Sequence, residues 1–249
     1  MKNGRSLDVR KLAVIGVLGA ISVVLGMTPL GFIPVGPTRA TIMHIPVIIG
    51  AVAEGPLVGG FVGLIFGLFS IFQAVTNPTP ISFVFYNPLV SVLPRILIGI
   101  VSYYVYKYIN NLGNKKTIGL LSIVYLGIIG YLFYGIYGTI KGEGSFWIVA
   151  MNVILILLTI AIGYFTIVKF KSSSLDLIIS AVVGTLTNTV GVLSMIYLLH
   201  AEKFVKSLGA DVSSARKVIF GIGLTNGIPE TIIAVIIVSG VIGALRSRK

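Results

Sequence analysis

Long apolar stretches alternate with short polar or Pro- and Gly-rich stretches along the whole chain. Eight of them are candidates for membrane helices, which need about 20 apolar residues to cross the hydrocarbon core of a bilayer. They cover about Leu7–Met27, Ala40–Ala53, Leu57–Val75, Ile81–Ile109, Ile118–Gly138, Phe146–Val168, Leu175–Ala201 and Val218–Leu245. The pattern predicts an all-α, polytopic transmembrane helical bundle of about eight helices.

The connection Thr28–Arg39 (TPLGFIPVGPTR) contains too many Pro and Gly residues to be helical. Backbone groups in lipid must be hydrogen-bonded within the protein. We therefore expect this stretch to lie outside the membrane or to fold over a cavity of the protein. The following segment, Ala40–Ala53, is short for a crossing, since 14 helical residues span only about 21 Å.

Composition supports a membrane protein and sets its predicted orientation. Hydrophobic residues make up 56% of the 249 residues and charged residues only 10%, against about 25% charged in soluble domains. The net charge of +12 comes from Lys and Arg residues dispersed at segment ends, so we attribute it to the positive-inside rule and not to nucleic-acid binding. If all eight segments cross, the side of the membrane that holds both termini carries twice as many Lys and Arg residues as the other side. Both termini are therefore predicted to be cytoplasmic, and a re-entrant Ala40–Ala53 would reverse this bias.

The first apolar segment lacks an A-x-A cleavage site, so we interpret it as a retained helix. One of its faces carries Ala13, Gly16 and Ala20. Small residues spaced by four allow another helix to approach closely. Two interpretations stay open for this face: packing inside the chain or docking of a partner. For the glycines at every fourth position of Leu57–Val75, internal packing is favoured.

Polar residues inside membrane segments are costly and usually face a cavity or a partner. Asn87, Ser91 and Arg95 follow one another at intervals of four and share a helix face. Arg95 lies too deep to reach the membrane surface easily, and a guanidinium binds a carboxylate through two parallel hydrogen bonds. The alternative is a structural ion pair with Glu54 or Glu230.

Further polar residues lie in other segments. Asn188 is flanked by Thr185, Thr187 and Thr189, and it suits either a ligand with amide or hydroxyl groups or a hydrogen bond between helices. Asn226 and Glu230 are one turn apart, and a carboxyl group at that depth needs a partner. His44 is a candidate ligand contact or proton site, with a structural role as the alternative.

Several chemistries are excluded by missing motifs. The sequence contains no cysteine, no Walker A lysine motif, no HExxH and no GxSxG, and its few carboxylates are scattered. We expect no catalytic residues, no metal site and no cofactor in this chain. Active transport would then draw its energy from a gradient or from a partner.

Four strings follow one another along the chain: Ala40–Ser70 (ATIMHIPVIIGAVAEGPLVGGFVGLIFGLFS), Phe85–Gly99 (FYNPLVSVLPRILIG), Gly184–Leu198 (GTLTNTVGVLSMIYL) and Leu224–Ala234 (LTNGIPETIIA). Together they resemble the S components of energy-coupling-factor (ECF) vitamin transporters, and most of all the pantothenate-type branch. The resemblance covers about 1–112 and 174–249. Residues 113–173 look like a helical hairpin inserted into a six-helix core, within one membrane domain that spans 1–249.

The resemblance implies a substrate-capture subunit in a bacterial plasma membrane. Such a subunit binds a vitamin in a cavity on the extracellular side, covered by the loop after the first helix. It docks through small residues of that helix, here Ala13, Gly16 and Ala20, on a transmembrane coupling subunit. Two cytoplasmic ATPase subunits hydrolyse the ATP.

The candidate ligand is pantothenate, whose carboxylate suits Arg95, or else Arg39, and whose amide and hydroxyl groups suit the asparagines. The expected substrate-binding residues are Arg39, His44, Asn87, Ser91, Arg95, Asn188, Asn226 and Glu230. Riboflavin, folate or a pyridoxine-like vitamin are alternatives, because Phe83, Phe85 and Tyr86 are available to stack on a ring. An ion-coupled secondary transporter, with His44, Glu54 and Glu230 as a proton path, is the alternative from another class.

Overall fold

The computed structural model describes residues 8–35, 38–141 and 175–247, together with short helical pieces between 149 and 164. The chain divides into two compact units. The larger unit comprises Met1–Lys107 and Leu177–Lys249, and the smaller one comprises Tyr108–Asp176.

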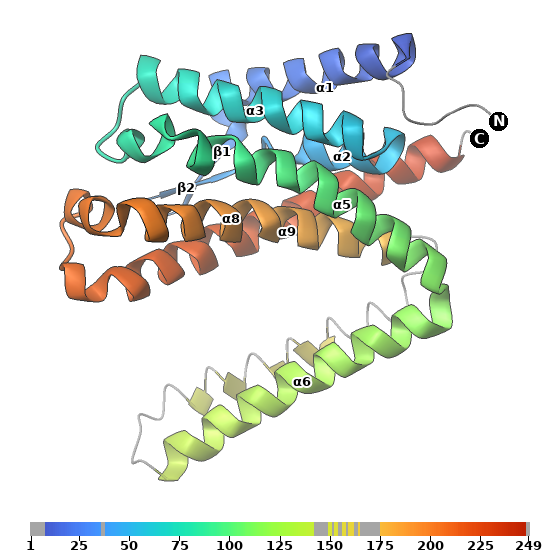
Figure 1. Cartoon of the computed structure of the whole chain (residues 1–249). Helices are drawn as coiled ribbons and strands as arrows, with labels where there is room; N and C mark the ends of the chain where they lie inside the picture. The colour runs from blue at the N-terminus through green and yellow to red at the C-terminus, as the bar shows by residue number, and fades with distance from the viewer. Residues whose placement is uncertain are drawn as a thin grey trace. The chain divides into compact units, whose positions relative to one another are not determined.

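The larger unit is a helical bundle with a small β-hairpin between its helices (Figure 1). Five described helices or helix pairs are long and apolar enough to cross a membrane, which confirms the predicted all-α polytopic class. The elements that build this unit or lead into it are α1 (Val9–Met27), η1 (Pro29–Gly31), β1 (Phe32–Val35), β2 (Thr38–Thr41), α2 (Ile45–Glu54), α3 (Pro56–Thr76), η2 (Ser82–Tyr86), α4 (Pro88–Ser91), α5 (Leu93–Leu112), α8 (Leu175–Ser207), η3 (Val212–Ser214) and α9 (Ala215–Ser247).

The β-hairpin corrects the prediction that Ala40–Ala53 is helical from its first residue. β1 and β2 pair antiparallel with Phe32 opposite Thr41, and α2 has only ten residues. A helix of that length spans about 15 Å, so α2 alone is too short for a crossing. Buried backbone N–H and C=O groups need hydrogen-bond partners. In the hairpin ahead of α2, the two strands pair with each other, and Ile42 N–H donates to the Gly31 carbonyl, 3.1 Å away.

The predicted segment Ile81–Ile109 is not a single helix, because it divides into η2, α4 and α5. The prolines account for the breaks: Asn87, just before Pro88, is extended, and Pro94 has no N–H to donate to the Val90 carbonyl. Asn87 caps the short α4: its Oδ1 accepts a hydrogen bond from Leu89 N–H at 3.0 Å.

The glycines of α3 bring it into backbone contact with α5. A Cβ atom built on Gly63 would lie 2.2 Å from the Arg95 carbonyl oxygen, and one on Gly59 would lie 2.9 Å from the Gly99 Cα. Such distances are too short for any side chain. These positions therefore serve internal packing, as predicted, and they fix where α5 begins.

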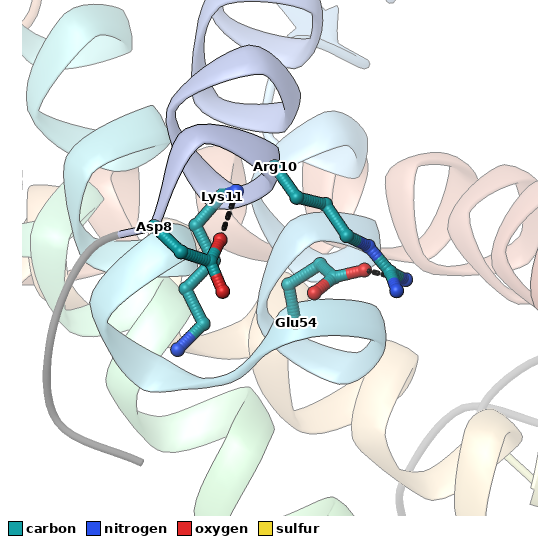
Figure 2. A network of polar contacts seen from close by, with 4 residues as sticks. All are labelled: Asp8, Arg10, Lys11 and Glu54. Atoms are coloured by element: carbon teal, nitrogen blue, oxygen red, sulfur yellow. Dashed lines mark hydrogen bonds and ion pairs between the residues drawn. The ribbon is translucent and has the colours of Figure 1, made fainter. Parts of the chain in front are cut away.

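Two polar links tie helix ends together at one end of the larger unit. Arg10 at the start of α1 pairs with Glu54 at the end of α2 at 2.5 Å, as Figure 2 shows. Arg246 near the end of α9 donates to the Tyr106 hydroxyl, 2.8 Å away in α5. The first turn of α1 and the last turns of α9 therefore lie at the same end of the larger unit (Figure 1).

The polar connection predicted at Glu202–Lys217 is largely helical. α8 continues through a kink at His200 to Ser207, and α9 already starts at Ala215. Glu202 and Lys206 form an exposed ion pair at 2.6 Å with the i,i+4 spacing that supports a helix in water. Gly209, with φ of 74°, then supplies the turn.

The smaller unit contains α6 (Asn114–Lys141), which includes the predicted helix Ile118–Gly138. Most of the predicted helix Phe146–Val168 lies outside the described residues. The interpretation of 113–173 as an inserted hairpin within a single membrane domain stays a prediction.

Candidate functional site

A group of polar side chains is buried inside the larger unit, at depths where its helices are otherwise apolar. His44 precedes α2, Ser91 ends α4, Arg95 starts α5, Asn188 lies in α8 and Glu230 in α9. None of the five is more than 5% exposed. Burying such groups is costly unless they are hydrogen-bonded, so the partners of each one show what it does.

Arg95 is held by aromatic rings and by one carbonyl group. Its guanidinium carbon lies 5.3 Å from the centre of the Phe66 ring and 5.8 Å from that of Phe85, within the range of cation–π attraction. Nη1 donates to the Val90 carbonyl. Nε is buried without a hydrogen-bond partner. The charge is therefore fixed in position, and one N–H remains to be satisfied.

Neither carboxylate expected as a structural partner for Arg95 forms an ion pair with it among the described residues. Glu54 pairs with Arg10 at the end of the bundle (Figure 2), so that alternative is wrong. Glu230 interacts with Arg95 electrostatically, but no contact within 4.0 Å joins them. Arg95 and Glu230 therefore share the same buried interior without a direct contact.

Glu230 connects three parts of the fold. Its Oε1 accepts a hydrogen bond from the Thr41 backbone N–H at 2.6 Å, and its Oε2 accepts one from the Thr189 hydroxyl at 3.1 Å. The carboxylate therefore joins α9 to the end of β2 and to α8. It satisfies a hairpin N–H that lacks a strand partner.

Asn188 and His44 line the α8 side of this interior. Asn188 Oδ1 is buried without a hydrogen-bond partner, although it sits one residue from the Thr189 that binds Glu230. His44 Nε2 lies 3.0 Å from the Thr185 hydroxyl, which gives His44 a structural contact between α2 and α8. In this interior, Asn188 Oδ1, Arg95 Nε and His44 Nδ1 are thus all buried without a hydrogen-bond partner.

Other predicted residues have contacts of their own. Asn87 acts as the cap of α4, and Ser91 donates its hydroxyl hydrogen to the Phe85 carbonyl. Asn226 is half-buried one turn before Glu230. Arg39 has its backbone in β2, paired with Pro34, while its side chain lies outside what is described.

Some contacts in this interior were not among the expected site residues. Thr185 and Thr189 were noticed only as neighbours of Asn188, although their spacing of four already places them on one helix face. Phe66 is one of several apolar residues in a glycine-rich helix, so the sequence did not indicate that its ring lies beside Arg95. The N–H of Thr41 is a backbone group, so its role could not be predicted from the residue type.

The arrangement suits a ligand with an anionic acceptor at one end and a hydrogen-bond donor at another. Arg95 would receive the first and Asn188 the second, and each contact would remove the cost of a buried unsatisfied group. Among the described residues, no cluster of His, Asp and Glu side chains could hold a metal ion.

The small residues of α1 face away from the bundle. Ala13, Gly16 and Ala20 are exposed, and a Cβ built on Gly16 would meet no atom within 4 Å. Gly19, by contrast, faces inward, where its Cβ would lie 2.6 Å from Ile65. The stripe predicted from sequence is therefore not used for packing within the described part of this chain.

Comparison with known proteins gives one family and two curated relatives. The profile of the family described as ECF transporter, substrate-specific component, matches residues 10–140. The chain is 36% identical over 127 residues to the pantothenic acid transporter PanT of Lactococcus lactis subsp. cremoris, an alignment that covers 45% of this chain and 63% of the relative. It is 40% identical over 78 residues to the pantothenate transporter PanT of Leuconostoc mesenteroides subsp. mesenteroides, covering 31% of this chain and 38% of the relative. The chain thus aligns with less than two thirds of each relative.

Proposed function

Because the chain belongs to the family of ECF transporter substrate-specific components, we propose that it is the substrate-capture subunit of a vitamin importer and that its ligand is pantothenate. Both relatives described above are named as transporters of this compound. The observation that carries the proposal is the pair of unsatisfied buried atoms, Arg95 Nε and Asn188 Oδ1. They are a donor on a cation and a neutral acceptor.

Pantothenate has the groups that this pair lacks. Its carboxylate accepts hydrogen bonds from the free edge of the Arg95 guanidinium, with charge assistance. Its amide N–H or a hydroxyl group donates to Asn188, and the second hydroxyl lies within the reach of the polar groups around Glu230. Its dimethyl group packs on apolar side chains of the core. Vitamins without a carboxylate leave Arg95 unsatisfied.

Transport requires partners under this proposal. The chain has no motif for ATP hydrolysis, so the energy comes from two cytoplasmic ATPases through a transmembrane coupling subunit. The exposed face of Ala13, Gly16 and Ala20 is the surface that docks on it. The bundle sits in a bacterial plasma membrane with both termini in the cytoplasm and the ligand interior open toward the outside.

Calorimetric titration of the purified protein in detergent tests the ligand. Pantothenate, riboflavin, folate and pyridoxine are each added to wild type and to Arg10→Gln, a control that removes a guanidinium at the far end of the bundle. We expect saturable binding of pantothenate alone, equal in both proteins. Binding of another vitamin instead would contradict the choice of ligand, and binding of none by folded protein would contradict the capture role.

A further inference from the structure

An apolar groove runs along the outer surface between α3 and α5. Its volume is about 390 Å³, and its lining includes Gly60 and Phe61 from α3 and Ile96, Ile100 and Tyr104 from α5. Both helices are candidate membrane spans. The groove therefore faces the lipid and has no part in the buried polar interior.

The glycines of α3 explain why the groove exists. Gly59 meets Gly99 backbone to backbone, which draws the two helices together. Gly60, the next residue, turns outward, and the nearest atom to a Cβ built there is Ile96 Cγ2 at 4.0 Å. The floor of the groove thus lies at backbone level, while Phe61 at its rim is 41% exposed.

One end of the groove carries an unused positive charge. Ile96, Ile100 and Tyr104 lie on one face of α5, and the same face continues to Lys107 one turn further. Lys107 is exposed, and within the described part of the chain it forms no hydrogen bond or ion pair. The Arg10 and Arg246 side chains at this end of the bundle are engaged with Glu54 and Tyr106.

The lining and the charge of the groove favour a lipid chain as its occupant. The lining on α5 extends from Ile96 to Tyr104, about 12 Å along the helix axis. This lining is apolar and aromatic, and the same face of α5 continues to the exposed Lys107. A single hydrocarbon chain is narrow enough to lie between Phe61 and Tyr104 on the glycine floor.

We propose that this groove binds one acyl chain of an anionic phospholipid whose phosphate group contacts Lys107. The apolar lining takes the chain, Tyr104 lies at the boundary with the headgroups as interfacial aromatic residues do, and Lys107 supplies the charge. A basic residue near the surface contributes about 1 kcal/mol to binding an anionic lipid. The proposal rests on the groove and Lys107 and is independent of the vitamin.

Native mass spectrometry of the purified full chain tests the site, with phosphatidylglycerol or phosphatidylcholine added in equal amounts. The variant Gly60→Leu fills the groove without a clash of its Cβ, and Gly240→Leu is the matched control, because a Cβ built there on α9 meets no atom within 4 Å. We expect wild type and Gly240→Leu to retain one phosphatidylglycerol that Gly60→Leu loses, while circular dichroism shows equal helix content for all three. Lys107→Gln should lower the preference for phosphatidylglycerol over phosphatidylcholine about fivefold.

Two results would overturn the proposal. Equal retention of lipid by Gly60→Leu and wild type would show that no lipid occupies the groove. If Gly60→Leu keeps its lipid but no longer associates with a transmembrane partner subunit, the groove is a protein interface instead.

Discussion

Helices α1 and α3 each carry small residues along one face, at intervals of three and four on α1 and of four on α3, yet these faces meet opposite surroundings. On α3, Gly63 touches the backbone of α5 at Arg95, and a side chain would not fit. On α1, Gly16 faces outward and a side chain would meet nothing. The small residues of α3 therefore bring α5 and Arg95 close to α3, whereas those of α1 leave an exposed face, which we propose as the docking surface. The comparison predicts that binding and coupling to a partner can be damaged separately.

The largest effect is expected from Gly16→Leu on transport. The side chain has room in the isolated chain but would keep a partner helix from approaching closely. Uptake of labelled pantothenate by vesicles that contain the complete complex should fall to background, while binding by the isolated protein is unchanged. Normal uptake by this variant would show that the outward face is not the docking surface.

Gly63→Ala, by contrast, should destabilise the fold of the isolated chain. Its Cβ would lie 2.2 Å from the Arg95 carbonyl oxygen, so α3 and α5 must separate at a cost of about 3 kcal/mol. Thermal unfolding in detergent should show a clear drop in midpoint. Gly60→Ala is the matched control, since the nearest atom to its Cβ is 4.0 Å away. Equal midpoints for the two variants would contradict the tight packing of α3 on α5.

Removing the positive charge of Arg95 should weaken pantothenate binding without affecting docking on the partner subunit. Hydrogen bonds to charged groups are worth about 1.5–3 kcal/mol, so Arg95→Gln should lower the affinity for pantothenate about 10- to 150-fold. Calorimetric titration measures it, with Arg10→Gln as the control guanidinium. An unchanged affinity would mean that Arg95 is structural, and Arg39 would be the next residue to test.

The smallest effect is expected from Phe66→Leu, which removes one of the two rings beside the guanidinium. An aromatic ring near a cation contributes about 1 kcal/mol, so the preference for pantothenate over pantothenol, its analogue with an alcohol in place of the carboxylate, should fall about fivefold. Phe72→Leu, on the exposed side of the same helix, should leave that preference unchanged. A loss of affinity equal for both compounds would indicate a general packing defect and not a role in placing Arg95.

The apolar periodicity was sufficient to predict where most helices lie. α1, α3 and the start of α8 match their predicted segments within about two residues at each end, because long apolar runs in a membrane protein have few other solutions. The β-hairpin was missed, since Ala40 and Thr41 continue an apolar run that reads as helix. Pro88 and Pro94 lie beside the breaks at Asn87 and Val92, but a proline alone does not predict a break, since Pro229 lies inside the continuous α9.

The site was predictable only as a set of polar residues on the right helices. That Glu230 binds the N–H of Thr41 depends on a contact between positions 189 residues apart, which no local pattern encodes. The inward position of the α3 glycines was predicted, whereas the pattern left two interpretations open for Ala13, Gly16 and Ala20, because small residues on a helix face do not show what packs against them. Such choices are made by tertiary packing and not by the residues alone.

The most direct test of the account is a pair of calorimetric titrations on the wild-type protein, one with pantothenate and one with pantothenol. The account predicts that pantothenate binds about 10- to 150-fold more tightly, because only its carboxylate satisfies the buried guanidinium of Arg95. Equal affinities for the two compounds would contradict it, since the unsatisfied N–H of Arg95 would then have no part in recognising the ligand.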